Sequence, residues 1–313
     1  DRLPIISDKR KNSTGGYYAY LKIAEGCNKN CTYCIIPSLR GNYRSYPLED
    51  LLTQANNLAD QGIKELILVA QETTLYGTDL YGEKTLPKLL KELAKIKGIE
   101  WIRILYCYPE EITDELIDVI ANEDKVCKYL DIPIQHASDN ILRRMARRTN
   151  HDDLVKVINK LRKKIPDITL RTTIISGFPG ETDEDLEKLI DFVKEIKFER
   201  LGVFTYSEEE GTVAAGFENQ IDEEEKEARR DRIMRVQQEI SKENLEKLVG
   251  KTYKVIIEGR LPDEDVYIGR TYMDVPGVDG YVFVNSDKNY MSGDFCDVII
   301  TGSSEYDLIG DAV

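Results

Sequence analysis

The sequence predicts an α/β protein: a partial barrel of six parallel βα units, followed by a small antiparallel β-barrel. Residues 17–206 alternate short β-branched apolar runs with segments of helical periodicity, as repeated βα units do. From residue 251 onward only short strands separated by Pro, Gly, Asp and Ser turns follow, which is typical of a small antiparallel barrel. The apolar strands predict a sheet covered on its outer face, with active groups at the carboxyl ends of the strands.

Each expected element follows from its own pattern. The six strands of the partial barrel are expected at residues 18–23, 65–70, 101–106, 129–132, 169–175 and 202–206, and the helices between them at 48–58, 86–96, 113–121, 142–146, 154–161 and 186–196. A charged helix over 222–247 starts from Asp222 with acids in its first turn and stops before Gly250. The second unit is expected to have strands at 255–257, 267–268, 281–284 and 295–300. These patterns divide the chain into a domain at 1–246 and a small barrel domain at 247–313.

Composition narrows the class of protein. No apolar run in the 313 residues approaches the roughly 20 that a membrane helix needs, so we expect no membrane association. Six cysteines and no signal peptide favour reduced thiols and a cytoplasmic location. The net charge of −14 disfavours general phosphate binding and favours a basic partner. The chain begins at Asp1 rather than Met, so we expect it to be a fragment of a longer protein.

Three cysteines follow the first expected strand: Cys27, Cys31 and Cys34, with the spacing C-x3-C-x2-C. Three thiolates are one fewer than a cubane iron–sulfur cluster normally takes, which leaves one metal position open for chemistry. Incidental thiols and a zinc site are the alternatives. A structural zinc site uses four Cys or His ligands, and the only histidines are His136 and His151.

This cysteine run resembles the signature of radical S-adenosylmethionine enzymes. Further runs resemble the methylthiotransferase subfamily, at residues 34–37, 40–41, 44–45, 71–77, 133–135, 145–148 and 177–182, and the terminal barrel resembles a TRAM domain. The resemblance implies that Cys27, Cys31 and Cys34 bind a [4Fe–4S] cluster whose open iron takes S-adenosylmethionine. Transfer of one electron then cleaves this cofactor to methionine and a 5′-deoxyadenosyl radical. The cofactor then supplies the hard chemistry, and the protein positions and shields it.

Within the subfamily, the sequence resembles most closely the enzymes that add a methylthio group to the β-carbon of an aspartate in a basic small-subunit ribosomal protein. An electron donor such as flavodoxin or ferredoxin is implied as a second partner. By resemblance, the full-length enzymes carry an N-terminal domain with a second [4Fe–4S] cluster, and no such domain precedes Asp1. We therefore expect this chain to bind and cleave the cofactor without completing methylthio transfer.

The resemblance also implies contacts to the cofactor, and these are Tyr33, Gln71, Glu72, Arg147, Thr172 and Gly177. Four of them have a plainer interpretation: an exposed turn for Gln71 and Glu72, a tight βα turn for Gly177, and a solvated helix residue for Arg147. His136, at the end of the fourth strand, contacts substrate or cofactor, or is a buried structural histidine. No catalytic residue is assigned.

Charge separates the expected substrate from RNA. Residues 250–313 carry five Lys or Arg and twelve Asp or Glu, a net charge of −7. An RNA-binding barrel needs a positive groove, so a nucleic-acid partner is disfavoured and a basic protein is favoured. The acidic run 208–210 after the sixth strand could attract such a substrate or be a solvated loop. A tRNA adenosine methylthiotransferase and a zinc-bound, non-catalytic interaction module remain as alternatives.

Overall fold

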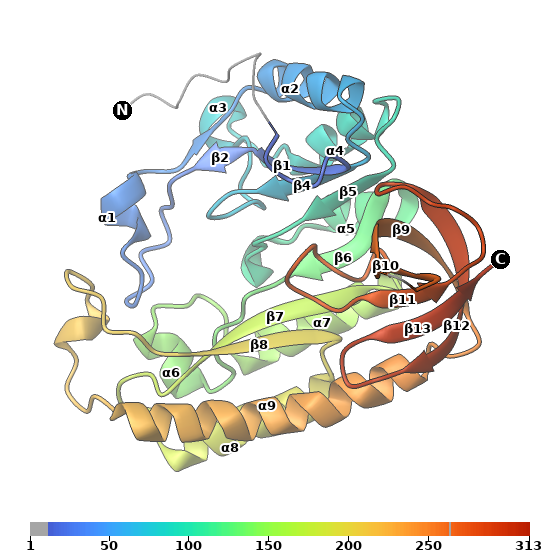
Figure 1. Cartoon of the computed structure of the whole chain (residues 1–313). Coiled ribbons are helices and arrows are strands. Elements are labelled where there is room, and N and C mark those ends of the chain that lie inside the picture. Colours follow the sequence, from blue (N-terminus) through green and yellow to red (C-terminus); the bar gives the residue numbers. More distant parts are fainter. Residues whose placement is uncertain (1–11, 263) are drawn as a thin grey trace.

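The computed structural model describes residues 12–262 and 264–313 (Figure 1). Residues 1–11 of the expected first domain therefore lie outside the described residues. Six parallel strands form one sheet in the order β1-β4-β5-β6-β7-β8, which is also their order along the chain. Their bounds are β1 Tyr18–Lys22, β4 Glu65–Val69, β5 Trp101–Ile104, β6 Val126–Asp131, β7 Thr169–Ser176 and β8 Arg200–Thr205.

Helices cover the outer face of this sheet (Figure 1). They are α2 Leu48–Asp60, α4 Leu86–Ala94, α5 Asp114–Asn122, α7 His151–Lys164 and α8 Asp183–Ile196, with the shorter α1 Ile36–Arg40, α3 Thr78–Tyr81, α6 Asp139–Arg144, η1 Pro109–Glu111 and η2 Ala214–Gly216 in the loops. The short antiparallel pair β2 Ala24–Glu25 and β3 Arg44–Ser45 closes the base of the cysteine loop. None of the helices in the described part of the chain is long and apolar enough to cross a membrane.

The two faces of each strand have different partners because successive side chains point to opposite sides. In β4, Leu66 and Leu68 belong to the core shared with the helices. Ile67, between them, belongs to a separate apolar cluster on the inner face, together with Ile256 and Val275 of the C-terminal region. The inner face of the partial barrel is thus filled in part by the second domain.

The long helix α9, Glu223–Glu246, leads to a closed five-stranded barrel. Figure 1 shows α9 running beside α8 and beneath β8 to this barrel. The barrel contains β9 Thr252–Arg260, β10 Val266–Arg270, β11 Val282–Asn285, β12 Phe295–Ser303 and β13 Leu308–Ala312, in the order β10-β11-β13-β12-β9.

The expected α/β class, with a partial barrel followed by a small β-barrel, is confirmed. Two details differ from the sequence pattern. Strand β13 was not expected, and it pairs in parallel with β11 while the other four pairings of the barrel are antiparallel. The expected helix over 142–146 begins earlier, at Asp139, and ends before Ala146, whose φ of 55° breaks the helical conformation.

A buried ion cluster joins the two domains. Glu65 accepts hydrogen bonds from Arg103 Nε at 2.8 Å and from Arg270 Nη2 at 2.6 Å, and Arg103 Nη1 also donates to the Tyr272 carbonyl oxygen at 2.5 Å. Glu65, Arg103 and Arg270 have no exposed side-chain surface. Burial alone would raise the pKa of Glu65, but the guanidinium groups of Arg270 and Arg103 lower it below the usual value.

We expect Glu65→Gln to lower the free energy of unfolding by about 3 kcal/mol at pH 7, because it leaves the buried Arg103 without a carboxylate partner and the buried Arg270 with Glu258 alone. Since the folded pKa of Glu65 is depressed, its contribution is fully present above pH about 4.3, the pKa of Glu in an unfolded chain, and is lost as pH falls through the folded pKa. Urea unfolding from pH 7 to pH 3 measures both effects. Glu100→Gln, whose exposed carboxylate pairs with Lys254, is the control and should change little. A Glu65→Gln deficit that stayed constant down to pH 3 would contradict this.

Candidate functional site

The three cysteines lie in one loop at the carboxyl end of β1, between β2 and α1. Gly26 opens the loop with φ of 83°, and a Cβ at this position would lie 2.2 Å from the Asn42 carbonyl oxygen. Only glycine fits such a close approach in this backbone conformation. The Gly26 N–H donates to Gln71 Oε1 at 2.7 Å, which ties the loop to the end of β4.

Neighbouring loops hold the same segment from its other side. The Thr32 N–H donates to the Met145 carbonyl oxygen at 3.1 Å, and Ala214 N–H donates to the Thr32 carbonyl oxygen at 2.8 Å. Lys29 is buried, and its ammonium pairs with Glu110 at 3.0 Å and also with Glu111. Connections after β5, β6 and β8 therefore all contact the cysteine loop.

The thiols lie in a partly dry environment. Cys27 and Cys31 are buried and Cys34 is half-buried. Burial raises the pKa of the Cys27 and Cys34 thiols. The Lys29 N–H donates to Cys27 Sγ at 3.5 Å, and Arg147 Nη1 lies 4.0 Å from Cys31 Sγ. A backbone donor and a guanidinium are thus placed to stabilise thiolates, which are the form that binds metal.

The donor set fits an iron–sulfur cluster in kind, because soft thiolates are its usual ligands. The described residues contain no group of three or more His, Cys, Asp or Glu side chains arranged to hold one metal ion. In a [4Fe–4S] cluster each cysteine binds a different iron, so its thiolates need not converge on a single point.

A cavity of about 570 Å³ lies directly beside the loop. Cys27 and Cys34 line it, with Gln71 from the end of β4 and mostly apolar or aromatic neighbours; the rest of the lining is Tyr20, Lys22, Ile36, Val69, Ala70, Leu105, Tyr106, Tyr108, Val275 and Val278. Its position matches the expectation that active groups gather at the carboxyl ends of the parallel strands.

Three of the predicted cofactor contacts lie next to the cysteines. Gln71 lines the cavity, and Tyr33 packs edge-on against Phe178 with ring centroids 6.5 Å apart. Arg147 is buried rather than solvated: its Nη2 donates to the Pro133 carbonyl oxygen at 2.9 Å, and its guanidinium lies over the Tyr108 ring at 4.2 Å. These positions agree with the predicted roles, which stay predictions.

Glu72 is fully buried rather than part of an exposed turn. Its Oε1 accepts hydrogen bonds from the Thr74 N–H at 2.9 Å and from the Thr74 hydroxyl. Its Oε2 has no hydrogen-bond partner among the described residues. Burial raises the pKa of Glu72 to about 7. A buried carboxylate oxygen without a partner is suited to receive a ligand N–H.

Thr172 lies differently from what a cofactor contact requires. Its hydroxyl donates to the Ile132 carbonyl oxygen at 2.8 Å and accepts from the Ile134 N–H at 3.3 Å, so it joins β7 to the chain after β6. Leu170 and Ile174, two residues to either side, face the helix-covered core. By strand alternation Thr172 shares that outer face, and the geometry does not support its predicted role.

Gly177 has a structural reason to be glycine. Its φ is 70°, and a Cβ there would lie 2.3 Å from Lys226 Cγ on α9. Its N–H donates to Glu181 Oε2 at 3.1 Å. Glycine thus permits the close approach of α9 to the loop after β7, whether or not a cofactor also lies there.

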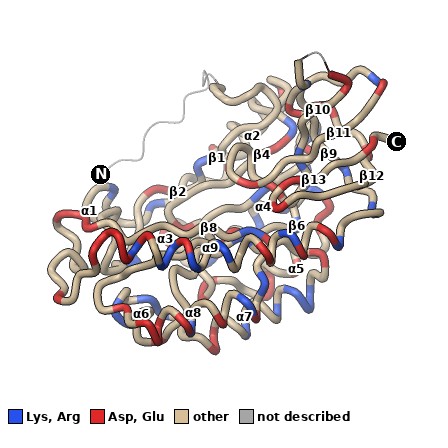
Figure 2. The backbone as a smooth tube through the Cα atoms, turned by 60° about the horizontal axis from the view of Figure 1, so that its bottom comes forward, with Lys and Arg blue, Asp and Glu red and all other residues tan. Residues whose placement is uncertain are grey.

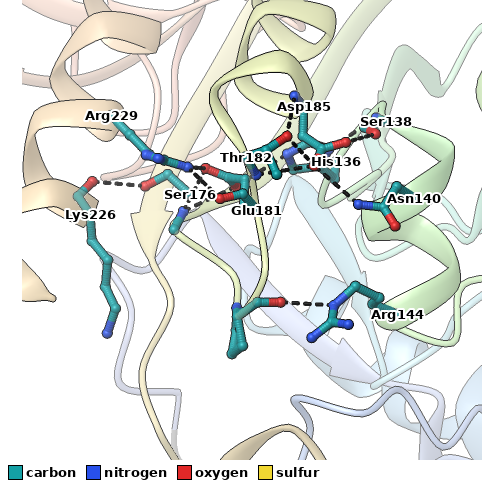
Figure 3. Close-up of polar contacts among 12 residues, drawn as sticks. His136, Ser138, Asn140, Arg144, Ser176, Glu181, Thr182, Asp185, Lys226 and Arg229 are labelled. Atoms are coloured by element: carbon teal, nitrogen blue, oxygen red, sulfur yellow. Dashed lines mark hydrogen bonds and ion pairs between the residues drawn. The ribbon is translucent and has the colours of Figure 1, made fainter. Parts of the chain in front are cut away.

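Figure 3 shows the polar network that includes Glu181. This buried carboxylate also accepts from His136 Nε2 at 3.2 Å and from Arg229 Nη1 of α9 at 2.9 Å. His136 Nδ1 accepts from the Ser138 N–H at 3.0 Å, which leaves the proton on Nε2. His136 is therefore placed as a buried structural histidine that connects the loops after β6 and β7.

Among the lining residues that sequence reasoning missed are Tyr106, Tyr108, Val275 and Val278. Tyr106 has φ of 59°, a backbone conformation that is unfavourable for tyrosine and that no local sequence motif predicts. The two tyrosines do follow a strand end, which was an available signal. The two valines belong to the β10–β11 connection of the C-terminal barrel, more than 200 residues after the cysteines in the sequence. No local pattern predicts that they line the same cavity.

Comparison with known proteins matches this architecture. The chain matches the radical SAM superfamily over residues 21–193 and the TRAM domain over residues 249–313. It is 60% identical over 312 residues to the ribosomal protein uS12 methylthiotransferase RimO of Lachnoclostridium phytofermentans, covering 100% of this chain and 71% of that protein. It is 55% identical over 301 residues to the protein of the same name from Clostridioides difficile, covering 96% of this chain and 68% of that protein.

Solved structures show the same fold at low identity. The radical S-adenosylmethionine methyltransferase TsrM from Kitasatospora setae, with tryptophan substrate and a SAM analogue bound, has a TM-score of 0.52 at 18% identity, over 62% of this chain and 39% of that chain. Methylornithine synthase PylB has a TM-score of 0.50 at 15% identity, over 71% of this chain and 63% of that chain. The sequence matches, rather than these, identify the family. The chain belongs to the radical S-adenosylmethionine superfamily and, within it, to the RimO family of methylthiotransferases.

Proposed function

We propose that this chain carries the radical S-adenosylmethionine part of a methylthiotransferase that acts on an aspartate β-carbon of ribosomal protein uS12. The observation that carries the proposal is the placement of three thiols in one loop, where Cys27 and Cys34 line a cavity and Cys31 lies buried beside Arg147. Cys27, Cys31 and Cys34 would hold a [4Fe–4S] cluster. When bound, this cluster supplies the electron that cleaves S-adenosylmethionine, with flavodoxin or ferredoxin as the external donor.

The residues of the chain prepare the site for this chemistry. Gln71 and Gly26 fix the cysteine loop against β4, and Arg147 supplies positive charge beside Cys31. The apolar and aromatic lining keeps water away from the place where a reactive radical would be formed. Glu72 Oε2, which has no hydrogen-bond partner among the described residues, would accept an N–H of the cofactor's methionine end.

The choice of a protein substrate rests on charge. Glu208, Glu209 and Glu210 are exposed just after β8, on the carboxyl side of the sheet. Figure 2 shows Asp and Glu alternating with Lys and Arg along α9, so no continuous positive track runs along that helix. A basic ribosomal protein would be attracted to the acidic run, whereas tRNA would be repelled.

Anaerobic reconstitution should load about four irons per 313-residue chain and give deoxyadenosine on reduction in the presence of S-adenosylmethionine. Cys31→Ala should lose both, because it removes one of three ligands. Cys296→Ala, a half-buried thiol of the C-terminal barrel, is the control and should keep both. Iron content and chromatography of the nucleoside measure the outcome. One zinc per chain with no iron would instead support the non-catalytic interaction module.

Affinity for S-adenosylmethionine should rise by up to about tenfold between pH 6 and pH 8, as Glu72 ionises through a pKa of about 7. Oε1 of Glu72 already accepts from Thr74, so an ionised carboxylate is needed to leave Oε2 as an acceptor for the cofactor, and Glu72→Gln should bind more weakly at pH 8 and lose the pH dependence. Equilibrium dialysis of the reconstituted protein measures this. The exposed Glu83→Gln should behave like the unsubstituted chain. An unchanged pH response in Glu72→Gln would exclude this role.

Replacing Glu208, Glu209 and Glu210 together by Gln should weaken uS12 binding by about tenfold at low salt and much less at high salt, since exposed charges are screened. The control replaces three exposed acids at the far end of α9, Glu239, Glu243 and Glu246, and should have a smaller effect. Fluorescence anisotropy with labelled uS12 and with tRNA measures both partners. Tighter binding of tRNA than of uS12 would favour the tRNA-modifying alternative.

A further inference from the structure

The cavity beside the cysteines has walls from both domains. Cys27 and Cys34 line one side, and Val275 and Val278 of the β10–β11 connection line another. Val275 is buried, while the side chain of Val278 is 56% exposed and free to meet a ligand. Figure 1 shows this connection extending from the C-terminal barrel toward the inside of the partial barrel, alongside β6.

Buried pairs fix the position of this connection. Asp274 accepts from Arg200 Nε at 3.0 Å and Nη2 at 2.5 Å. Asp279 accepts from the Tyr129 hydroxyl at 2.9 Å and from the Val275 N–H at 2.9 Å. Both carboxylates are almost fully buried. Because an unpaired buried charge is costly, the connection cannot leave the inner face without large loss of stability.

The same pairs continue to another lining residue of the cavity. Asp279 Oδ1 lies 3.4 Å from Arg171 Nε, and Arg171 Nη1 donates to Asp131 Oδ1 at 3.0 Å. Asp131 Oδ2 accepts from the Tyr106 N–H at 3.1 Å. Tyr106 lines the cavity in a positive-φ conformation, which its surroundings must hold in place.

The geometry points to a second role for the C-terminal barrel, inside the reaction cavity. Val278 forms the floor against which the substrate side chain is placed. Asp279, acting through Arg171 and Asp131, is a positioning residue for Tyr106. This inference rests on the proposed function: it makes the barrel a specificity element at the reacting atoms, in addition to any role in docking the basic protein.

Val278→Trp tests the floor, because the larger side chain would fill space that the substrate needs. Ile309→Trp is the control, on an exposed residue of the same barrel that does not line the cavity. In reconstituted protein, Val278→Trp should keep its iron content while its affinity for recombinant uS12 falls at least tenfold. The control should bind like the unsubstituted chain. Equal affinity of the two tryptophan variants would overturn the assignment.

Asp279→Asn tests the relay. We expect amide hydrogen exchange at Tyr106 to become at least fivefold faster, since Arg171 is then held less firmly on Asp131. Asp311→Asn, whose exposed carboxylate accepts a hydrogen bond from Asn285, is the matched control. Identical exchange at Tyr106 in the two variants would overturn the relay. This measurement needs neither cluster nor substrate, so it stays decisive even if the unsubstituted chain failed to cleave S-adenosylmethionine, a result that would remove the proposed function instead.

Discussion

The shared direction of six parallel strands is the constraint on which the site depends. It brings the loops after β1, β4, β5, β6 and β7 to one edge of the sheet. The loop that carries the three thiols is therefore supported there by its neighbours. The cysteine loop receives a hydrogen bond acceptor from Gln71 after β4 and another from Met145 after β6. A change in register of any of these strands would therefore displace a support of the thiols as well as a part of the core.

The six-stranded sheet is not closed into a barrel, and the second domain packs against its open inner face. A closed eight-stranded barrel fills its interior with layers of its own side chains. Here the inner face carries Glu65 and Arg103, which are tolerated only because Arg270 of the C-terminal barrel completes their pairing. Ile256 and Val275 add apolar packing at the same place. The C-terminal barrel thus packs against the inner face of the first domain. Val275, which belongs to this packing, also lines the cavity.

The sequence predicted the βα order, the long α9 and the cysteine loop because each rests on local periodicity or spacing. It did not predict β13, where Gly310 and Asp311 interrupt the apolar pattern that marks a strand. Thr172 was placed in the pocket from resemblance, although the alternation of Leu170 and Ile174 indicated its outer face. Val278 could not have been found, because its place in the cavity depends on ion pairs between distant segments.

Those ion pairs also reduce the net negative charge that residues 250–313 present at the surface. Three of the twelve acids of the C-terminal region form ion pairs: Glu258 with Arg270, Asp274 with Arg200, and Asp279 with Arg171. Setting aside these acids and Arg270 leaves nine acids against four cations, a net charge of −5. The remaining charge of the C-terminal region is thus still negative, but less so than composition suggests. The two charges by which these totals differ are those of Asp274 and Asp279, which hold the β10–β11 connection in the cavity. The carboxylates that fix this connection are therefore different from those that give the barrel its negative surface.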